Sequence, residues 1–236
     1  MEQQLQILIN REWTAPWADR LLAFLSDFGA WAPWILLLVL AGVLLGDFKL
    51  RAAILTIGLA IGLCDGIGVN ILKHVVARPR PSQSEAGVRF VKMGAAPRHF
   101  PKIAGLVSAP LVSYPQGRDI PKNLGGIIAD PDPHLQGRSF PSGHAANNMA
   151  VATVLILFYP RRGWLYLPLA LLIGYARIYT GSHWPLDVMM GFFMGIIVGS
   201  IAVLIMEYFW RRFGPRLFPA EAAEFPSLRK IVWHTR

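Results

Sequence analysis

The stretch Ala176–Asp187, ARIYTGSHWPLD, joins two long apolar runs in the second half of the sequence. The runs extend over about 164–180 and 184–210 and reach the length that a helix needs to cross a bilayer. The junction carries His183 and Asp187, and ionisable groups near hydrocarbon are costly enough to be functional by default. The stretch therefore predicts two membrane-spanning helices that meet at a membrane surface in a chemically active turn.

Three further apolar runs precede this pair, at about 31–46, 52–72 and 142–159. The chain is 54% hydrophobic and 16% charged with a mean hydropathy of +0.42, values typical of membrane proteins rather than of a soluble core. We therefore predict an all-α fold, a polytopic transmembrane helical bundle of about five or six spans in a single domain, 1–236. Residues 1–29 are expected to form one or two interfacial helices, with a sixth span there as the alternative.

Two segments lie outside the expected spans. Residues 82–138 form an insert that is rich in Pro and Gly and lacks clear periodicity. This insert is interpreted either as an irregular surface loop or as a lid that touches lipid or the lipid head group, and the sequence does not separate the two. Residues 211–236 form a basic tail, which is expected to anchor at the membrane surface.

Basic residues mark one side of the predicted bundle. They lie at three places, which are Lys49 and Arg51, Arg161 and Arg162, and Arg211, Arg212 and Arg216. The positive-inside rule makes this side cytoplasmic. The polar ends of the other connections then meet at the opposite face, which would be the outer or periplasmic face of the plasma (inner) membrane.

Three short strings carry the chemistry. They are Lys73-x6-Arg80-Pro81, then Pro141-Ser142-Gly143-His144, then Arg177-x5-His183-x3-Asp187, each at the end of an apolar run. Together they provide three fixed cations, a Ser-Gly pair at a helix start and two histidines. Such groups can supply an anion cradle, a nucleophile and a general acid for phosphate transfer without a metal.

The second and third strings hold the groups that are expected to react. His183 and Asp187 are four residues apart, so the carboxylate can accept one ring N–H and leave the other nitrogen free to attack phosphorus. His144 lies in the first turn of a helix capped by Ser142 and is placed to act as a general acid, and Gly143 lets an anion approach the helix start. The structural alternatives are an ordinary helix cap at Ser142 and a His–Asp pair that caps an interfacial helix.

The cations Lys73, Arg80 and Arg177 are expected to hold the phosphate, because a planar guanidinium binds it in a bidentate way and an ammonium adds charge. Arg78 competes with Arg80 for this role. For Lys73, the alternative is a side chain that extends along the helix to reach the membrane surface. Asp65 is expected to pair within the bundle.

The sequence lacks the pattern of a metal or disulfide site. Its single cysteine, Cys64, has no partner, and no set of Cys, His and carboxylate residues near the strings has metal-ligand spacing. The formal net charge of +9 is interpreted as basic loops and contacts with anionic lipid. We therefore expect no metal, no cofactor and no nucleic-acid partner, and we expect Asn147 and Asn148 to form interhelical hydrogen bonds.

The three strings resemble the signature of the type 2 phosphatidic acid phosphatase superfamily of integral-membrane lipid phosphatases, which is K-x6-RP, PSGH and SR-x5-H-x3-D. Here they read KHVVARPRP, PSGH and ARIYTGSHWPLD, with Ala176 where the family usually has Ser. The resemblance covers roughly 50–200 without the insert. It implies these roles: phosphate held by Lys73, Arg80 and Arg177 with help from Ser142 and Gly143, a phosphohistidine at His183 oriented by Asp187, and a leaving alkoxide protonated by His144.

A site at the outer face, reached sideways from the bilayer, fits a lipid phosphate or diphosphate. Undecaprenyl diphosphate is favoured because its recycling needs an outer-face phosphatase, and the alternatives are phosphatidylglycerophosphate, phosphatidate and the lipid A 1-phosphate. Two other activities stay open, a phosphotransferase that passes the phosphoryl group to a second lipid and a non-enzymatic carrier of anionic lipid. A carrier needs cations, but it does not need both His144 and His183.

Overall fold

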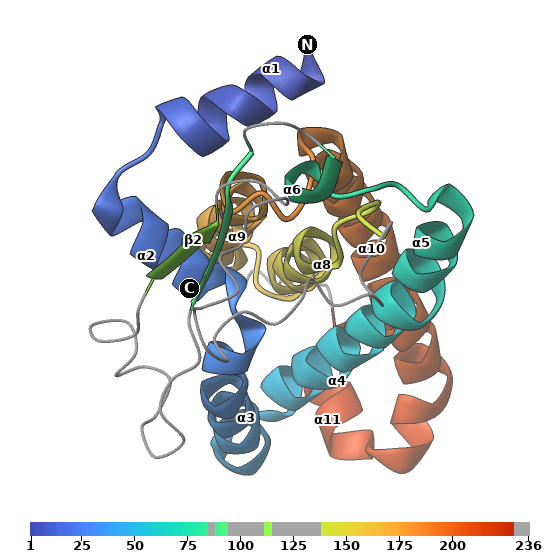
Figure 1. The fold of residues 1–236 in the computed structure, drawn as a ribbon. Helices are drawn as coiled ribbons and strands as arrows, with labels where there is room; N and C mark the ends of the chain where they lie inside the picture. Colours follow the sequence, from blue (N-terminus) through green and yellow to red (C-terminus); the bar gives the residue numbers. More distant parts are fainter. Residues whose placement is uncertain (85–87, 94–110, 115–137, 229–236) are drawn as a thin grey trace.

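A computed structural model of the chain describes residues 1–84, 88–93, 111–114 and 138–228. In those residues the fold is helical apart from one small antiparallel sheet (Figure 1). The helices are α1 (Glu2–Ile7), α2 (Pro16–Ser26), α3 (Phe28–Leu45), α4 (Phe48–Leu63), α5 (Asn70–Val76), α6 (Pro81–Ser84), α8 (Gly143–Phe158), α9 (Leu167–Tyr179), α10 (Pro185–Leu217) and α11 (Pro219–Glu224). A π-helical turn, Leu8–Glu12, continues α1, a second one, Cys64–Val69, joins α4 to α5, and a 3-10 turn, Gly163–Tyr166, leads into α9.

Five helical segments occupy the apolar runs in which membrane spans were predicted. The helix α3, the continuous segment from α4 to α6 and the helix α10 are long and apolar enough to cross a membrane, whereas α8 and α9 have only 16 and 13 residues. α10 has 33 residues and ends at Leu217, beyond the boundary near residue 210, because hydropathy marks the edge of the apolar run and not the end of the helix. The helical membrane fold is thus confirmed, and the exact number of spans stays a prediction.

The helices α8 and α10 pack closely because α10 presents glycines to α8. Gly191, Gly195 and Gly199 are four residues apart, and a Cβ atom on Gly195 would lie 2.4 Å from the carbonyl oxygen of Ala146. Small residues at this spacing let two backbones approach one another in a membrane. The contact fixes the start of α8 against the start of α10, and these two helix starts carry most of the predicted site.

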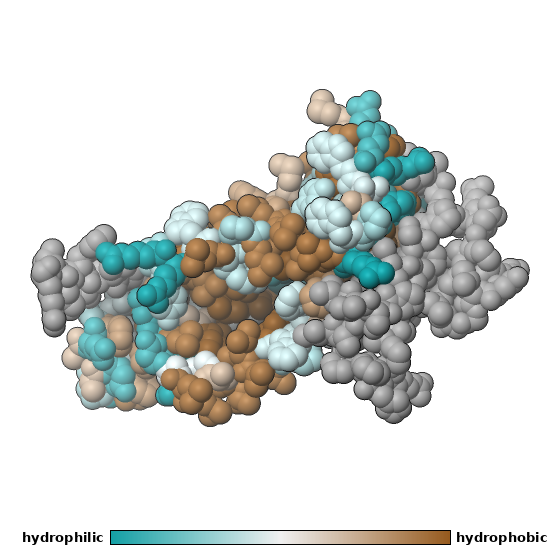
Figure 2. Space-filling view, turned by 90° about the vertical axis from the view of Figure 1, so that its left-hand side faces the viewer, coloured by the Kyte–Doolittle hydropathy of each residue, from teal (hydrophilic) through white to brown (hydrophobic). Residues whose placement is uncertain are grey.

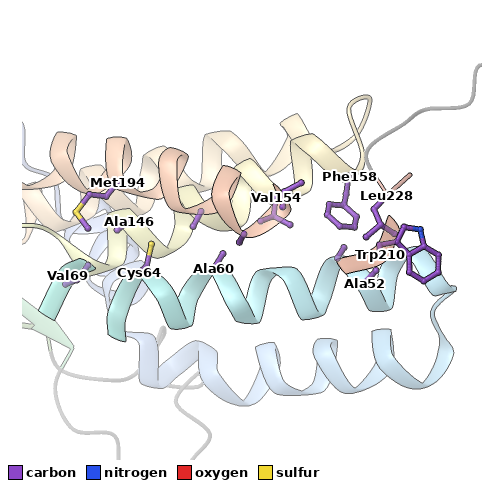
Figure 3. Packing of buried hydrophobic residues seen from close by; sticks show 14 residues of the cluster. Ala52, Ala60, Cys64, Val69, Ala146, Val154, Phe158, Met194, Trp210 and Leu228 are labelled. Atoms are coloured by element: carbon purple, nitrogen blue, oxygen red, sulfur yellow. The ribbon is translucent and has the colours of Figure 1, made fainter. Parts of the chain in front are cut away.

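The apolar core runs along α4, α8 and α10. Figure 3 shows Ala60 and Cys64 of α4 on the side of that helix that faces Val154 and Phe158 of α8. All four residues are fully buried. Small side chains on the inside are typical of membrane bundles, because lipid is as apolar as the core and does not drive large side chains inward.

The large apolar side chains lie on the outside of the bundle instead. Along α10 they form a stripe that includes Met189, Phe193 and Ile197, which are 64%, 58% and 41% exposed. Nearly all of α3 is exposed as well. Figure 2 shows the outcome as a hydrophobic belt between two more hydrophilic ends. An exposed apolar surface of this extent fits a bilayer and would cause aggregation in water.

The helices α1 and α2 lie against the end of the bundle where α9 leads into α10 (Figure 1). Gln6 donates a hydrogen bond of 2.9 Å to the carbonyl oxygen of Ile178, and Asn10 donates one of 2.6 Å to that of Tyr179. Asp19 of α2 accepts a hydrogen bond of 2.7 Å from the Tyr179 hydroxyl. The sequence predicted one or two helices here, and their position at the membrane interface stays a prediction.

The insert contains regular structure that its sequence did not predict. It opens with α6, and Phe90–Met93 pairs in an antiparallel sense with Leu111–Tyr114 as β1 and β2. The N–H of Val91 donates a hydrogen bond of 3.1 Å to the carbonyl oxygen of Thr180, which holds β1 to the bundle. A wholly irregular loop is therefore wrong for these residues, because short strands fixed by backbone bonds leave little periodic signal. The rest of 82–138 lies outside the described residues, and the lid hypothesis stays a prediction.

The basic connections gather at the opposite end of the bundle, as the order of the spans predicts. Lys49 lies with its ammonium nitrogen 5.2 Å from the ring centroid of Tyr159, so the first and second basic places meet. The tail turns back at this end, because the buried carboxylate of Glu207 accepts a hydrogen bond of 2.9 Å from the N–H of Leu228. The beginning of the tail thus packs on the bundle, and its role as a membrane anchor stays a prediction.

Candidate active site

The third string lies in contact with the other two. The N–H of Ser142 donates a hydrogen bond of 2.9 Å to the carbonyl oxygen of Asp187, which joins the second string to the third. Arg80 Nη1 donates one of 3.3 Å to the carbonyl oxygen of Ser182, which joins the first string to the third. Three stretches that are far apart in the sequence are therefore brought together at the end of the bundle that carries α1 and α6.

Lys73 lies beside the start of α8. Its ammonium nitrogen would be 3.9 Å from a Cβ atom built on Gly143, and a carboxylate oxygen of Asp65 would be 3.5 Å from the same point. The other oxygen of Asp65 accepts a hydrogen bond of 2.8 Å from Asn147, which is the kind of interhelical bond that was predicted. The position in front of Gly143 thus has room for a methyl group at ordinary contact distances, next to a helix start that favours anions.

His183 lies in the turn between α9 and α10 and is 3% exposed. Its Nδ1 atom lies 2.6 Å from the carbonyl oxygen of Ser139, and because a carbonyl can only accept, Nδ1 carries the proton. Nε2 is then the nitrogen with a free lone pair. Asp187 was expected to accept the ring N–H itself, but its carboxylate lies 3.8 Å from Nδ1, beyond hydrogen-bond distance. The expected tautomer is therefore set by the Ser139 carbonyl.

The environment of His183 favours the neutral ring. Burial lowers the pKa of the imidazole to about 4, with a further lowering by the charges of Arg177 and Arg80 and a partial opposing effect of Asp187. A histidine in this state keeps a lone pair on Nε2 at neutral pH, because protonation would remove it. The site therefore holds an imidazole that is ready to act as a nucleophile.

Asp187 is fully buried and acts on His183 through the groups that it binds. Its Oδ2 atom accepts hydrogen bonds from the Ser139 hydroxyl and from the N–H of Trp184, the latter at 3.0 Å. Its Oδ1 atom accepts one of 2.8 Å from Arg78 Nη1. Because Ser139 is held by this carboxylate and in turn holds the imidazole, Asp187 orients the ring at one remove.

Sequence reasoning missed Ser139 and treated Arg78 only as a competitor of Arg80 for phosphate. Arg78 uses its guanidinium on Asp187 and on Glu2, whose carboxylate lies 2.6 Å away, so it is committed to carboxylates. Ser139 belongs to none of the three strings. Its place shortly before the second string was the only signal that could have drawn attention to it.

Arg80 and Arg177 keep donors that no described residue uses. Arg177 Nη1 donates a hydrogen bond of 3.1 Å to the carbonyl oxygen of Ser26. The Nε atoms of both arginines are buried and have no hydrogen-bond partner within the described part of the chain. Two like charges with unsatisfied donors are unfavourable by themselves. An anion between them would supply the missing acceptors in the bidentate geometry that guanidinium groups prefer.

His144 lies in the first turn of α8, among the same charges. Those of Arg177, Lys73, Arg80 and His183 all act on its imidazole. The predicted general acid is therefore close to the predicted phosphate ligands and to the predicted nucleophile. This neighbourhood is required of a group that must give a proton to an oxygen on the phosphorus under attack.

The described residues offer no three His, Cys, Asp or Glu side chains that lie close enough together to hold a metal ion. A cavity of ≈ 430 Å³ lies at the other end of α8, lined by Asp47, Leu50, Leu155, Tyr159, Arg162 and Gly163. It is remote from His183 and does not belong to the candidate site.

A helical bundle with an apolar belt, and at one end a buried histidine among arginines, defines a membrane protein with a site for phosphate groups. The chain belongs to the PAP2 superfamily, whose family model matches residues 51–211. It is similar to LpxE from Aquifex aeolicus, whose crystal structure superposes with a TM-score of 0.55 at 26% identity over 85% of this chain and 93% of that one.

Two curated relatives match parts of the chain. An undecaprenyl-diphosphatase from Sulfolobus acidocaldarius is 37% identical over 75 residues, which are 31% of this chain and 36% of that protein. A lipid A 4′-phosphatase from Bacteroides thetaiotaomicron is 28% identical over 179 residues, which are 73% of this chain and 64% of that protein. The chain spans about a third of the length of the undecaprenyl-diphosphatases that it matches in Sulfolobus acidocaldarius and Bacillus subtilis.

Proposed function

We propose that this protein is a metal-independent lipid phosphatase that hydrolyses a membrane lipid phosphate or diphosphate through a phosphohistidine at His183. One observation carries the proposal. A buried imidazole with Nδ1 engaged and Nε2 free lies among Arg80 and Arg177, whose buried Nε atoms lack partners within the described residues. Membership of the PAP2 superfamily and the names of the relatives support the reaction class and a lipid substrate.

In the first step, Lys73, Arg80 and Arg177 hold the non-bridging oxygens of the phosphate, together with the N–H groups at the start of α8. The Nε2 lone pair of His183 forms the N–P bond while the P–O bond to the lipid breaks. The cations stabilise the charge on the equatorial oxygens of the transition state. His144 gives its proton to the leaving oxygen, and the negative charge of the bound phosphate favours the protonated state of this imidazole before transfer.

In the second step, a water molecule attacks the phosphorus and gives a proton to His144. The N–P bond breaks, its electron pair returns to Nε2, and inorganic phosphate leaves. His183 and His144 are then in their starting states, so the cycle needs no metal and no further reactant. Asp187 and Ser139 keep the ring in one tautomer through both steps.

We propose undecaprenyl diphosphate as the substrate, with the site at the outer or periplasmic face of the plasma membrane. The basic connections at the opposite end of the bundle support this orientation. Lipid A phosphates are the second candidate, because LpxE and the lipid A 4′-phosphatase are among the relatives. Phosphatidylglycerophosphate and phosphatidate complete the set of lipids to compare.

The deciding experiment measures phosphate release by the purified full chain from these four kinds of lipid, with and without EDTA. We expect release from at least one of them, fastest from undecaprenyl diphosphate, unaffected by the chelator and inhibited by vanadate. His183→Ala should lower turnover by several orders of magnitude while the protein stays folded. Comparable turnover by this variant would exclude the assigned nucleophile.

Two further outcomes would point to the other activities. A labelled phosphoryl group that appears on a second lipid, in place of inorganic phosphate, would identify a phosphotransferase. Binding of the lipid without transfer or release, and unchanged in His183→Ala, would identify a carrier.

A further inference from the structure

Glu2, the first residue of α1, contacts the network behind the candidate nucleophile. Its Oε2 atom lies 2.6 Å from Arg78 Nη2, and its Oε1 atom accepts a hydrogen bond of 3.0 Å from the N–H of Leu186 in the first turn of α10. The same guanidinium donates a hydrogen bond of 2.8 Å to Asp187. One end of the chain is therefore joined through a single arginine to the carboxylate that holds Ser139.

The contact has more than the strength of an ordinary surface ion pair. The side chains of Glu2 and Arg78 are only 22% and 26% exposed, and the Arg78 guanidinium lies over the Trp184 ring at 5.1 Å. A carboxylate at the start of α10 also interacts favourably with the free N–H groups and the dipole of that helix. A guanidinium held between two carboxylates and a ring has little freedom to turn away from Asp187.

The helix that carries Glu2 is fixed by contacts that do not involve Arg78. Gln6 and Asn10 are both fully buried and bind the backbone at the end of α9. The N–H of Arg89, next to β1, donates a hydrogen bond of 2.6 Å to Asn10, which adds a third anchor. Glu2 is therefore presented to Arg78 by a segment that the bundle already holds in place.

We infer that Glu2 is a positioning residue for the reaction, which acts through Arg78 on Asp187 and thereby on the ring of His183. The inference rests on the proposed function. It makes the N-terminal helix part of the catalytic assembly, although it lies outside the residues that the family model matches. A purely structural role, in which Glu2 only caps α10, is the alternative that the experiment must separate.

The test compares Glu2→Gln with Glu12→Gln in the full chain. Glu12 is the matched control, because it is exposed and ends the same helical segment. We expect Glu2→Gln to lower kcat roughly tenfold with KM changed less than about twofold, since the phosphate ligands are untouched. Glu12→Gln should keep wild-type values, and thermal unfolding should show that both variants are folded.

A double-variant cycle separates positioning from capping. If Glu2 acts through Arg78, Glu2→Gln should cost less than about twofold in kcat once Arg78→Lys is present, because coupled residues are not additive. A Glu2→Gln variant with the kcat of the wild type would overturn the inference. Equal losses of kcat with and without Arg78→Lys would overturn it as well, since a cap on α10 does not need Arg78.

A readout without lipid turnover keeps the inference apart from the proposed function. Diethylpyrocarbonate modifies neutral imidazoles, and the extent of reaction at His183 can be followed against pH by peptide mass spectrometry. We expect Glu2→Gln and Arg78→Lys to shift the midpoint of His183 by about half a pH unit or more, and Glu12→Gln to leave it in place. No phosphate release by the wild type together with this shift would refute only the proposed function. An unshifted midpoint in Glu2→Gln would refute the positioning role.

Discussion

At His183, hydrogen bonding and burial act on different properties of the same ring. The Ser139 carbonyl decides which nitrogen carries the proton, and burial beside Arg177 and Arg80 keeps the ring from taking a second one. Both effects favour a lone pair on Nε2. The nucleophile is thus prepared by its surroundings before any phosphate arrives.

The lowered pKa of His183, about 4, has a consequence for pH dependence. We expect modification of this residue by diethylpyrocarbonate to proceed at a constant rate from about pH 7.5 to 5.5, whereas N-acetylhistidine should lose reactivity with a midpoint near 6.5. Because the unfolded chain binds this proton more readily, the contribution of His183 to stability is present above about pH 6.5 and is lost as the pH falls toward 4. A midpoint near 6.5 for His183 in the folded protein would contradict the buried, neutral ring.

Ser139 provides a measure of how Asp187 works. Ser139→Ala keeps the carbonyl that holds the imidazole and removes only the hydroxyl that binds the carboxylate. We expect kcat to fall by about tenfold at most. Asp187→Asn should cost far more, because the bonds to Arg78 and Trp184 suffer as well. Steady-state phosphate release checks the order, and a larger loss in Ser139→Ala would mean that the hydroxyl has a direct role.

Spacing along a helix predicted the residues that belong to motifs, because four residues make one turn and bring His183 next to Asp187. It could not predict Ser139, which is 44 residues away from His183, or Glu2, which is 76 residues away from Arg78. These pairs meet only after the helices have packed. A polar residue of this kind has no periodic pattern that marks it as a partner.

At the scale of helices, hydropathy predicted where the segments lie but not how they pack. The apolar runs coincide with α3, α4, α8, α9 and α10 because a long run of apolar residues has few other stable forms in a membrane. The strands β1 and β2 escaped detection, since each has only four residues. The choice of partner depends on small residues, which hydropathy does not distinguish from other apolar ones.

The glycines of α10 allow the packing to be tested. A Cβ atom on Gly195 would lie 2.4 Å from the carbonyl oxygen of Ala146, so Gly195→Ala should force α8 and α10 apart and destabilise the fold by about 1–3 kcal/mol. The control is Gly62→Ala in the same bundle, because nothing lies within 4 Å of that Cβ position. Thermal unfolding in detergent should show a lower midpoint for Gly195→Ala only. Equal midpoints for the two variants would show that this contact does not limit stability.

For the whole molecule, the orientation in the membrane is the main prediction. Glu12 lies in the N-terminal segment packed at the site end, and Glu224 ends α11 at the basic end. We expect a cysteine at position 12 to react with an impermeant maleimide in intact spheroplasts, and one at position 224 to react only after lysis. Cys64 is fully buried and should add little background. The opposite labelling pattern would place the candidate site on the cytoplasmic side.

The unsatisfied guanidinium groups of Arg80 and Arg177 have a practical meaning at the bench. Any small oxyanion that settles between them relieves their repulsion and stabilises the folded state by mass action, by about 2.7 kcal/mol at a hundredfold excess over its dissociation constant. Sulfate or phosphate in a storage buffer would therefore preserve the protein and, at the same time, compete with a lipid for its place. The samples that survive purification best would be the ones that react most slowly in an assay.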